Sequence, residues 1–272
     1  MLTSLVLSLA VEAPVTIPRD VGPAVHAAFL ALLAERDAEL AAALHDADGP
    51  RPFTCSTLVG GQATGRTQRL APERALFIRV TGLEDAISDR LQALAAAPPP
   101  ALQILEAQLA VTGATLDPAV HPWAGEAGYE TLAAAHLLPG ESAARQATLD
   151  FVSPTAFRSG GRVVPLPLPE LVYGSLVDRW NAFAGVGLAD EMRRFAAECV
   201  SVSRYRLATQ AQRSRGGSMQ IGFTGRCSFT AFSGDRYWLG VLQLLTDFAF
   251  YAGVGYQTTM GLGQARRAEG GV

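Results

Sequence analysis

The stretch YAGVGYQTTMGLGQAR, residues 251–266, decides the fold that we expect for this chain. Its four glycines are Gly253, Gly255, Gly261 and Gly263. The stretch follows an apolar segment, 236–251, that predicts a helix, and it ends in a predicted strand. A dinucleotide-binding loop has a different order, because its glycines follow a first strand and open a helix. Glycine amides can approach a phosphate or a strand edge closely, so this stretch indicates either a cradle for a nucleic-acid backbone or a tight turn.

Upstream of this stretch, the first half of the chain predicts the order βαββαβ. In the first strand Leu5, Leu7, Leu9 and Val11 alternate with small or polar residues, as in a sheet with one face on a core. The elements that follow are a helix capped by Asp20, with the stripe Val25, Phe29, Leu32 and Leu33, that continues to about Leu44; strands at 52–60 and 74–80; a helix at 83–97; and a strand at 102–112.

The second half predicts a similar order of elements. They are a strand at 147–152, a hairpin at 158–164, a helix at 169–185, a further helix, strands at 200–211 and 220–232 around the tip QRSRGG, the apolar helix 236–251 and a closing strand within 258–267. We therefore expect an α+β protein with tandem ferredoxin-like (RRM-like, βαββαβ) domains and antiparallel sheets. The expected boundaries are 1–118 for the first domain, 119–146 for a connector and 147–272 for the second domain.

Composition limits the function classes. The 272 residues are 49% hydrophobic and 17% charged, which is typical of a folded protein of one or two domains. No apolar run reaches the roughly 18 residues that a membrane helix needs, and the first residues have no basic region of a signal peptide, so we expect a cytoplasmic protein without membrane contact. The three cysteines, Cys55, Cys199 and Cys227, are too far apart for a zinc motif, and we expect neither a metal nor another cofactor.

The charge is distributed unevenly. The net charge is −3, but residues 193–272 hold ten arginines against four acidic residues, a net charge of +6, which leaves −9 for residues 1–192. The basic part coincides with the glycine-rich part, which favours binding to nucleic acid. All 22 basic residues are arginine, which a GC-rich genome would explain, although guanidinium is also the better bidentate ligand for phosphate.

Several segments in order resemble one family. The glycine stretch and GFTGRCSFTAFSG (222–234) look like the C-terminal signature of the CRISPR-associated RAMP proteins, specifically the repeat-processing endoribonuclease. DFVSPTAFR (150–158), PLPLPELVYGSLVDRWNAF (165–183) and LHDADGPRPFTCSTL (44–58) are similar to strand, helix and turn segments of that family. The resemblance covers nearly the whole chain and implies tandem ferredoxin-like domains.

The resemblance also implies an activity. It implies a metal-independent endoribonuclease that binds CRISPR repeat RNA and cleaves pre-crRNA within each repeat by attack of a 2'-hydroxyl, leaving a 5'-hydroxyl and a 2',3'-cyclic phosphate. The alternative is a non-catalytic crRNA-binding RAMP subunit of a CRISPR effector complex. Beyond the RNA, other effector subunits and a second copy of the chain stay open as partners. A reading from another class is an enzyme that uses the glycine loops for the phosphate of a small molecule.

Such cleavage needs a base for the 2'-hydroxyl, an acid for the leaving oxygen and a cation for the phosphorane. His45, in the turn after the first helix, occupies the position that matches the family's catalytic histidine. His26 on the preceding helix is the expected second histidine, and Arg51 the charge-stabilising residue. Other relatives resemble a Tyr, His, Lys constellation, but this chain has no tyrosine before Tyr129 and no lysine. Proton transfer would therefore depend on the histidines, because arginine titrates too high.

RNA binding is expected from the basic half and from the glycines. The expected residues are Arg158, Arg162, Arg213, Arg215, Arg226 and Arg266, together with Gly253, Gly255, Gly261 and Gly263. For each arginine the alternative is a solvated surface charge. Of the remaining histidines, His121 is expected to anchor the connector and His136 to lie at a helix end near its dipole.

Overall fold

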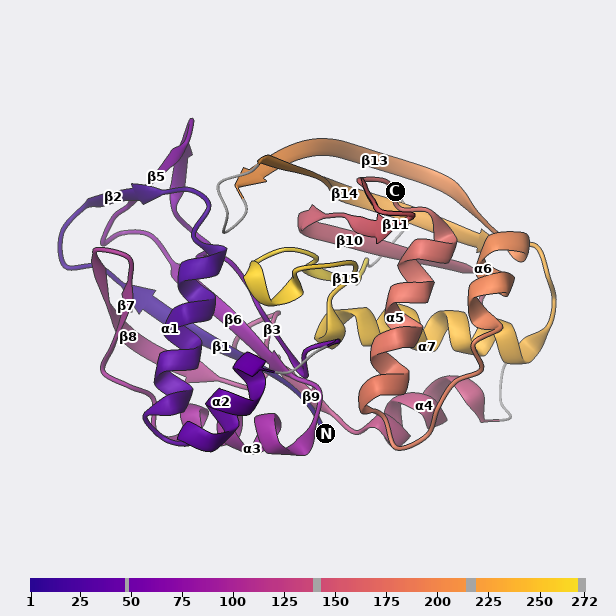
Figure 1. The fold of residues 1–272 in the computed structure, drawn as a ribbon, viewed down its shortest axis with the longest axis horizontal. Helices are drawn as coiled ribbons and strands as arrows, with labels where there is room; N and C mark the ends of the chain where they lie inside the picture. Colours follow the sequence, from indigo (N-terminus) through magenta and orange to yellow (C-terminus); the bar gives the residue numbers. More distant parts are fainter. Residues whose placement is uncertain (47–48, 139–142, 214–218, 269–272) are drawn as a thin grey trace. The chain divides into compact units, whose positions relative to one another are not determined.

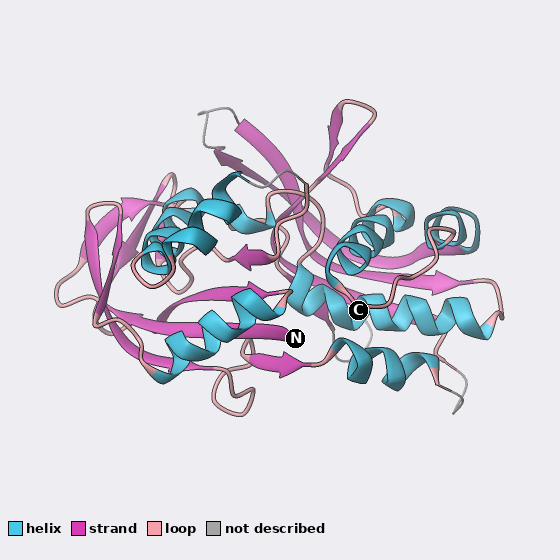
Figure 2. Ribbon diagram, turned by 60° about the horizontal axis from the view of Figure 1, so that its bottom comes forward, coloured by secondary structure: helices cyan, strands magenta, loops and turns pink. Residues whose placement is uncertain are grey.

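The computed structural model describes residues 1–46, 49–138, 143–213 and 219–268. The chain divides into two compact units. Unit 1 consists of Met1–Glu126 with Thr259–Gly261, and unit 2 consists of Ala127–Thr258 with Leu262–Val272. Figure 1 shows their elements, and Figure 2 distinguishes the helices from the strands on which they pack. Within the described ranges, no helix is long and apolar enough to cross a membrane.

Unit 1 is a ferredoxin-like domain. Its elements are β1 (Leu2–Ala10), β2 (Val15–Pro18), α1 (Gly22–Ala34), α2 (Ala38–Asp46), β3 (Phe53–Cys55), β4 (Gln62–Thr64), β5 (Thr67–Leu70), β6 (Leu76–Gly82), α3 (Asp85–Ala96), β7 (Ala101–Ile104), β8 (Ala107–Thr115) and β9 (Gly125–Ala127), of which the last ends one residue into unit 2. The main sheet has the antiparallel order β3-β6-β1-β8-β7, and β9 also pairs with β1. The first strand thus lies between the third and the fourth of the predicted βαββαβ order.

The first helical region differs from the prediction. Val25 and Phe29 are buried in α1 as expected, but α1 begins at Gly22 with Val21 at its N-cap, so the predicted capping by Asp20 is wrong. The helix also does not continue to Leu44. A break at 35–37 starts a second helix, α2, at whose beginning the Asp37 carboxylate accepts a hydrogen bond from the Leu40 N–H (3.0 Å). Such a side-chain acceptor satisfies one of the unpaired amides of a helix start.

The strands of unit 1 are more numerous than predicted. Instead of one strand at 102–112, β7 and β8 form a hairpin, with Leu105 at the turn in the left-handed region (φ 55°). The segment 56–75, between β3 and β6, contributes β4 and β5, which form a small separate sheet with β2 in the order β2-β5-β4. Strand β5 alternates exposed and buried residues, but its four-residue length gave little periodic signal.

The face of the main sheet opposite the helices carries a buried arginine. Arg79 of β6 is 2% exposed, and its Nε donates to Ser4 Oγ (2.7 Å) and to the Trp123 carbonyl (3.2 Å). Its guanidinium also lies over the Trp123 ring, 4.9 Å from the centroid. A buried charge needs such partners, and Trp123 therefore covers this part of the sheet. This explains why β1 is buried on both faces, although the alternation in its sequence predicts only one buried face.

Unit 2 repeats the ferredoxin-like order. Its elements are α4 (Tyr129–Leu137), β10 (Gln146–Thr155), β11 (Phe157–Ser159), β12 (Arg162–Val164), α5 (Pro169–Phe183), α6 (Met192–Cys199), β13 (Val200–Arg213), β14 (Met219–Ala231), α7 (Arg236–Ala252), a short 3₁₀ helix η1 (Thr258–Met260, shared with unit 1) and β15 (Ala265–Arg267). The main sheet has the antiparallel order β13-β14-β10-β15. The α+β class, the antiparallel sheets and the tandem ferredoxin-like arrangement are thus confirmed.

Candidate functional site

The first candidate site in unit 1 is the end of α2. His45 lies in the last turn of this helix, not in the turn beyond it as predicted, and its side chain is outside the described part of the structure. Arg51 Nη1 donates to the carbonyl of Leu44 (2.8 Å). Leu44 itself is 5% exposed and packs in the core. A cation that binds a carbonyl of the last helical turn is favourable, because that end carries partial negative charge. Arg51 is therefore held at the residue next to His45.

His26 lies near the same turn through its contact with β3. Its ring stacks on Phe53 at a centroid distance of 5.6 Å and an interplanar angle of 12°. Phe53 is 1% exposed and follows Arg51 by two residues, so the stacked ring has a fixed neighbour on one side. Phe29 contacts the same Phe53 ring, at a centroid distance of 5.4 Å.

The other two histidines lie in structural contacts. His121 Nδ1 accepts a hydrogen bond from the Trp123 N–H (3.2 Å), and desolvation, followed by the charge of Arg79, lowers the pKa of this imidazole. His136 lies in the last turn of α4, where its Nε2 is 2.6 Å from a carboxylate oxygen of Asp247. Both positions agree with the expected roles outside catalysis.

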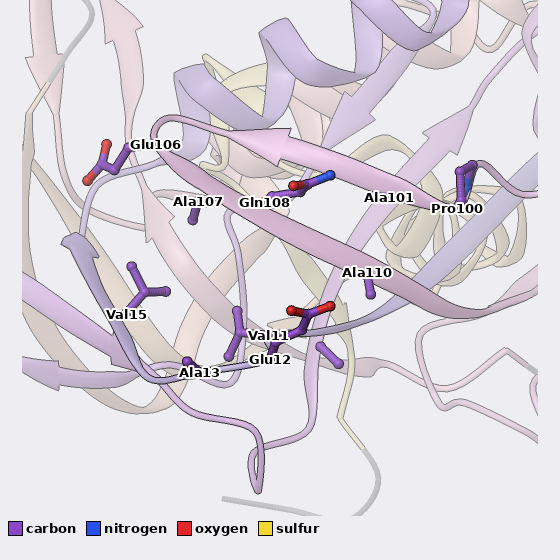
Figure 3. Close-up of a pocket in the computed structure, with 11 residues that line it drawn as sticks. Val11, Glu12, Ala13, Val15, Pro100, Ala101, Glu106, Ala107, Gln108 and Ala110 are labelled. Atoms are coloured by element: carbon purple, nitrogen blue, oxygen red, sulfur yellow. The ribbon is translucent and has the colours of Figure 1, made fainter.

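Unit 1 also has a groove that lies away from these residues. It measures about 440 Å³ and lies between the end of β1, β2 and the β7–β8 hairpin (Figure 3). Its lining includes the carboxylates of Glu12 and Glu106 and, within the described residues, no arginine. Phosphate groups would be repelled there, so the groove is not a candidate for RNA.

The sheet of unit 2 carries a row of charged residues on one face. Arg206, Arg226, Asp150 and Arg266 are direct partners across β13, β14, β10 and β15. Direct cross-strand partners point to the same face. Because the neighbouring core residues of β10 and β14 are buried toward the helices, this row lies on the face turned away from them.

Within this row, Arg226 and Asp150 form a bidentate ion pair, with N–O distances of 2.7 and 2.9 Å. The hydrogen bonds and charge of Asp150 raise the pKa of the Arg226 guanidinium. Arg206 is exposed and was missed by sequence reasoning, although its position two residues after Arg204 in a predicted strand places both on one face. The three arginines of the row exceed its one carboxylate by two charges.

The hairpin β11–β12 places its two arginines differently. Arg158 pairs across the hairpin with Val163, and Arg162 pairs with Ser159, so the two arginines project from opposite faces. Both are exposed. The guanidinium of Arg158 lies over the ring of Tyr256, 5.0 Å from its centroid. Of the predicted tip residues, Arg213 ends β13 with its side chain outside the described part, and Arg215 lies outside the described residues.

The backbone of the glycine stretch is hydrogen-bonded within the protein. The Gly253 N–H donates to the Ala249 carbonyl and the Gly255 N–H to Ser175 Oγ. The Gly261 N–H donates to the Cys55 carbonyl and the Gly263 N–H to the Pro154 carbonyl. Gly255 (φ 80°) and Gly263 (φ 67°) have left-handed backbone angles, and a Cβ on either would collide with the carbonyl of Ala156 or Val254. In the described chain, these buried glycines thus serve close packing, and their bonded amides are not free to donate to RNA.

Arg179 of α5 holds this backbone in place. Its guanidinium donates to the carbonyls of Ala252 (2.6 Å), Gly253 (3.0 Å) and Gly255 (2.6 Å). Desolvation lowers the pKa of Arg179 to about 10, which still leaves it charged at neutral pH. Sequence reasoning missed this residue, because nothing in the helix pattern distinguishes an arginine that binds backbone carbonyls from a surface arginine.

The protein thus has two ferredoxin-like domains of the RRM-like type, and the sheet of the second carries the charged row. Two family models match the chain: the CRISPR Cas6 N-terminal domain over residues 1–134 and the CRISPR-associated endoribonuclease Cas6 over residues 149–265. The chain belongs to the Cas6 family.

Individual relatives agree with this assignment. A solved Cas6 product complex is similar over 98% of this chain and 100% of that chain, with a TM-score of 0.79 and 29% identity. Cas6 of Thermus thermophilus has a TM-score of 0.74 and 26% identity, with 98% of each chain covered. The CRISPR-associated endoribonuclease Cas6 of Mycobacterium tuberculosis is 32% identical over 127 residues, which is 45% of this chain and 38% of the length of that relative.

Proposed function

We propose that the protein is a metal-independent endoribonuclease that binds CRISPR repeat RNA and cleaves pre-crRNA within each repeat. Family membership supports this activity, and one of the similar structures is a product complex. In the proposed reaction the 2'-hydroxyl attacks the adjacent phosphate, the 5'-oxygen leaves with a proton, and the products carry a 2',3'-cyclic phosphate and a 5'-hydroxyl. The charged row of the unit 2 sheet, with Arg226 and Arg266, and the arginines of the β11–β12 hairpin bind the RNA backbone.

The catalytic residues that we propose are His45, His26 and Arg51. His45 and His26 share the proton transfers, because an imidazole titrates near neutral pH and can act as base or acid. Arg51 supplies the positive charge for the phosphorane. The observation that carries this assignment is the hydrogen bond from Arg51 to the Leu44 carbonyl, which fixes a cation beside the helix turn that bears His45.

A cleavage assay with the cognate repeat RNA in EDTA tests this proposal. We expect one cut per repeat, abolished by a single 2'-deoxy substitution at the cut site. His45→Ala should lower the single-turnover rate by roughly 10²–10⁴-fold, the usual contribution of a general acid or base. His136→Ala is the matched control, because His136 lies in unit 2 on Asp247, and it should leave the rate within a few fold of wild type. A rate for His45→Ala equal to that of the control would reject the assignment.

The alternative function is a non-catalytic RNA-binding subunit. The absence of lysine and of a tyrosine before Tyr129 favours it, since the chain lacks two groups that other relatives use. It predicts tight binding of the repeat RNA without cleavage under the same conditions. In either case several phosphate contacts should make the affinity fall steeply with salt, whereas a small-molecule enzyme would show little salt dependence of RNA binding.

A further inference from the structure

The pair Arg158 and Tyr256 forms a flat, partly exposed surface in unit 2. Arg158 is exposed on β11, Tyr256 is half-buried in the glycine stretch, and the guanidinium lies 5.0 Å from the ring centroid. The Tyr256 N–H donates to the carbonyl of Ala156, close to Arg158 in sequence, so the two backbones are joined (3.1 Å). Among the described residues, neither side chain makes a further hydrogen bond or ion pair.

The loop that carries Tyr256 is fixed before any ligand binds. Arg179 binds the carbonyls of Ala252, Gly253 and Gly255, and the Gly255 N–H donates to Ser175 Oγ (3.2 Å). These bonds hold the backbone immediately before Tyr256. The side chain is thus presented by a rigid segment, and a ligand that contacts it would not have to order the loop.

The chemistry of this place favours a nucleobase over a phosphate. The four glycine amides are already bonded to protein acceptors, and the sequence YQTTM (256–260) contains no basic residue. What the loop offers is an aromatic ring with a planar guanidinium on it. Unpaired RNA bases stack on tyrosine rings and on arginine planes, whereas paired bases are covered by their neighbours in the duplex.

We propose that Arg158 and Tyr256 form a stacking subsite for one unpaired base of the bound RNA. The base lies against the Arg158–Tyr256 pair, and the charge of Arg158 also favours the flanking phosphate. This inference rests on the proposed RNA binding but not on the catalytic residues. It adds Tyr256, which sequence reasoning did not select, to the residues that recognise the RNA.

Abasic scanning of the repeat RNA tests the subsite. A series of uncleavable 2'-deoxy-blocked repeats, each lacking one base, is titrated against the full chain by fluorescence anisotropy. Stacking of one base on an aromatic residue contributes about 1–3 kcal/mol, so we expect one abasic position to weaken binding roughly 5- to 150-fold. Tyr256→Leu should weaken binding of intact RNA by a similar factor and should lose nothing further at that same position.

Further variants separate stacking from charge and from misfolding. Tyr256→Phe should bind like wild type, and Arg158→Lys, which keeps the charge but not the plane, should show part of the loss. The matched control is Tyr205→Leu, a tyrosine 67% exposed on β13, which should leave the abasic profile unchanged. If Tyr256→Leu does not fold, Arg158→Gln gives the same test, because Arg158 is exposed.

The outcomes distinguish this inference from the proposed function. If the loss of affinity caused by Tyr256→Leu multiplied with the loss at every abasic position, the subsite would be overturned. The proposed function would still stand as long as the protein cleaved intact repeat RNA. A protein that does not bind repeat RNA would overturn both. Equal abasic profiles for wild type and Arg158→Gln would also reject the subsite.

Discussion

Replacing Arg179 should loosen the glycine stretch more than any surface change in unit 2. In Arg179→Met the aliphatic stem is retained, but the carbonyls of Ala252, Gly253 and Gly255 lose their donor. All three carbonyls belong to buried residues, so water cannot replace the guanidinium without opening the segment. The lost bonds, rather than lost packing, determine the expected effect.

The magnitude follows from the number of bonds. A hydrogen bond to a charged group contributes about 1.5–3 kcal/mol net. We take the lower end, because the lowered pKa of Arg179 shows that its desolvation is costly. Three bonds then correspond to about 4–5 kcal/mol, a large part of the roughly 5–15 kcal/mol that stabilises a folded domain. Arg179→Lys, with a single ammonium, should keep about one of the three bonds.

Urea unfolding and hydrogen exchange measure this loss. The exchange protection of the Gly253 and Gly263 amides should fall in Arg179→Met before the rest of unit 2 unfolds, because both lie in the released segment. The control is Arg193→Met, which breaks an exposed ion pair with Asp178 and should cost less than about 1 kcal/mol. The reasoning would be refuted if Arg179→Met matched the Arg193→Met control in both measurements.

Three further predictions concern unit 2. Gly255→Ala should destabilise it by more than about 1 kcal/mol in urea unfolding, because it combines a left-handed φ with a clash, and Gly160→Ala, at φ 55° in open space, should cost less. Burial raises the pKa of Asp247, but hydrogen bonds from His136 and Arg267 outweigh burial and lower it. The ionised Asp247 carboxylate therefore stabilises the fold fully above the unfolded pKa near 3.9, and this stabilisation is lost as pH falls through the folded pKa. In Asp247→Asn, the free energy of unfolding should depend less on pH in that window. Arg206→Gln should make the fall of log RNA affinity with log salt concentration less steep by about 0.7–0.9. A steepness equal to that of wild type would show that Arg206 does not contact the RNA.

The parts of the fold that could be predicted are those with a long periodic signal. The stripe of Val25 and Phe29 in α1 and the alternation in β1 each repeat several times, so tertiary contacts reinforced the local pattern. The break before α2 could also have been found, because Asp37 followed by an amphipathic segment is a helix-start signal. The small sheet of β2, β4 and β5 could not, since its strands have only three or four residues.

The site was harder to predict, because it depends on contacts between residues far apart in the sequence. Arg79 and Arg179 look like surface arginines in the sequence, yet each binds backbone carbonyls 44 or more residues away. Arg226 was expected to face RNA, but 76 residues upstream Asp150 supplies its partner in the adjacent strand. Only the strand register, which a single sequence does not give, reveals such pairs.

These contacts also explain why the glycine stretch indicates the family more clearly than it indicates the chemistry. Its glycines are required by the backbone itself: Gly255 and Gly263 each occupy a left-handed angle against a neighbouring carbonyl, and no other residue fits both conditions. A sequence constrained so strongly by its own packing is easy to identify, but its four glycine amides already donate to acceptors within the protein. We therefore place recognition in side chains that this loop presents, and the proposed subsite uses Tyr256, whose ring lies 5.0 Å from the Arg158 guanidinium.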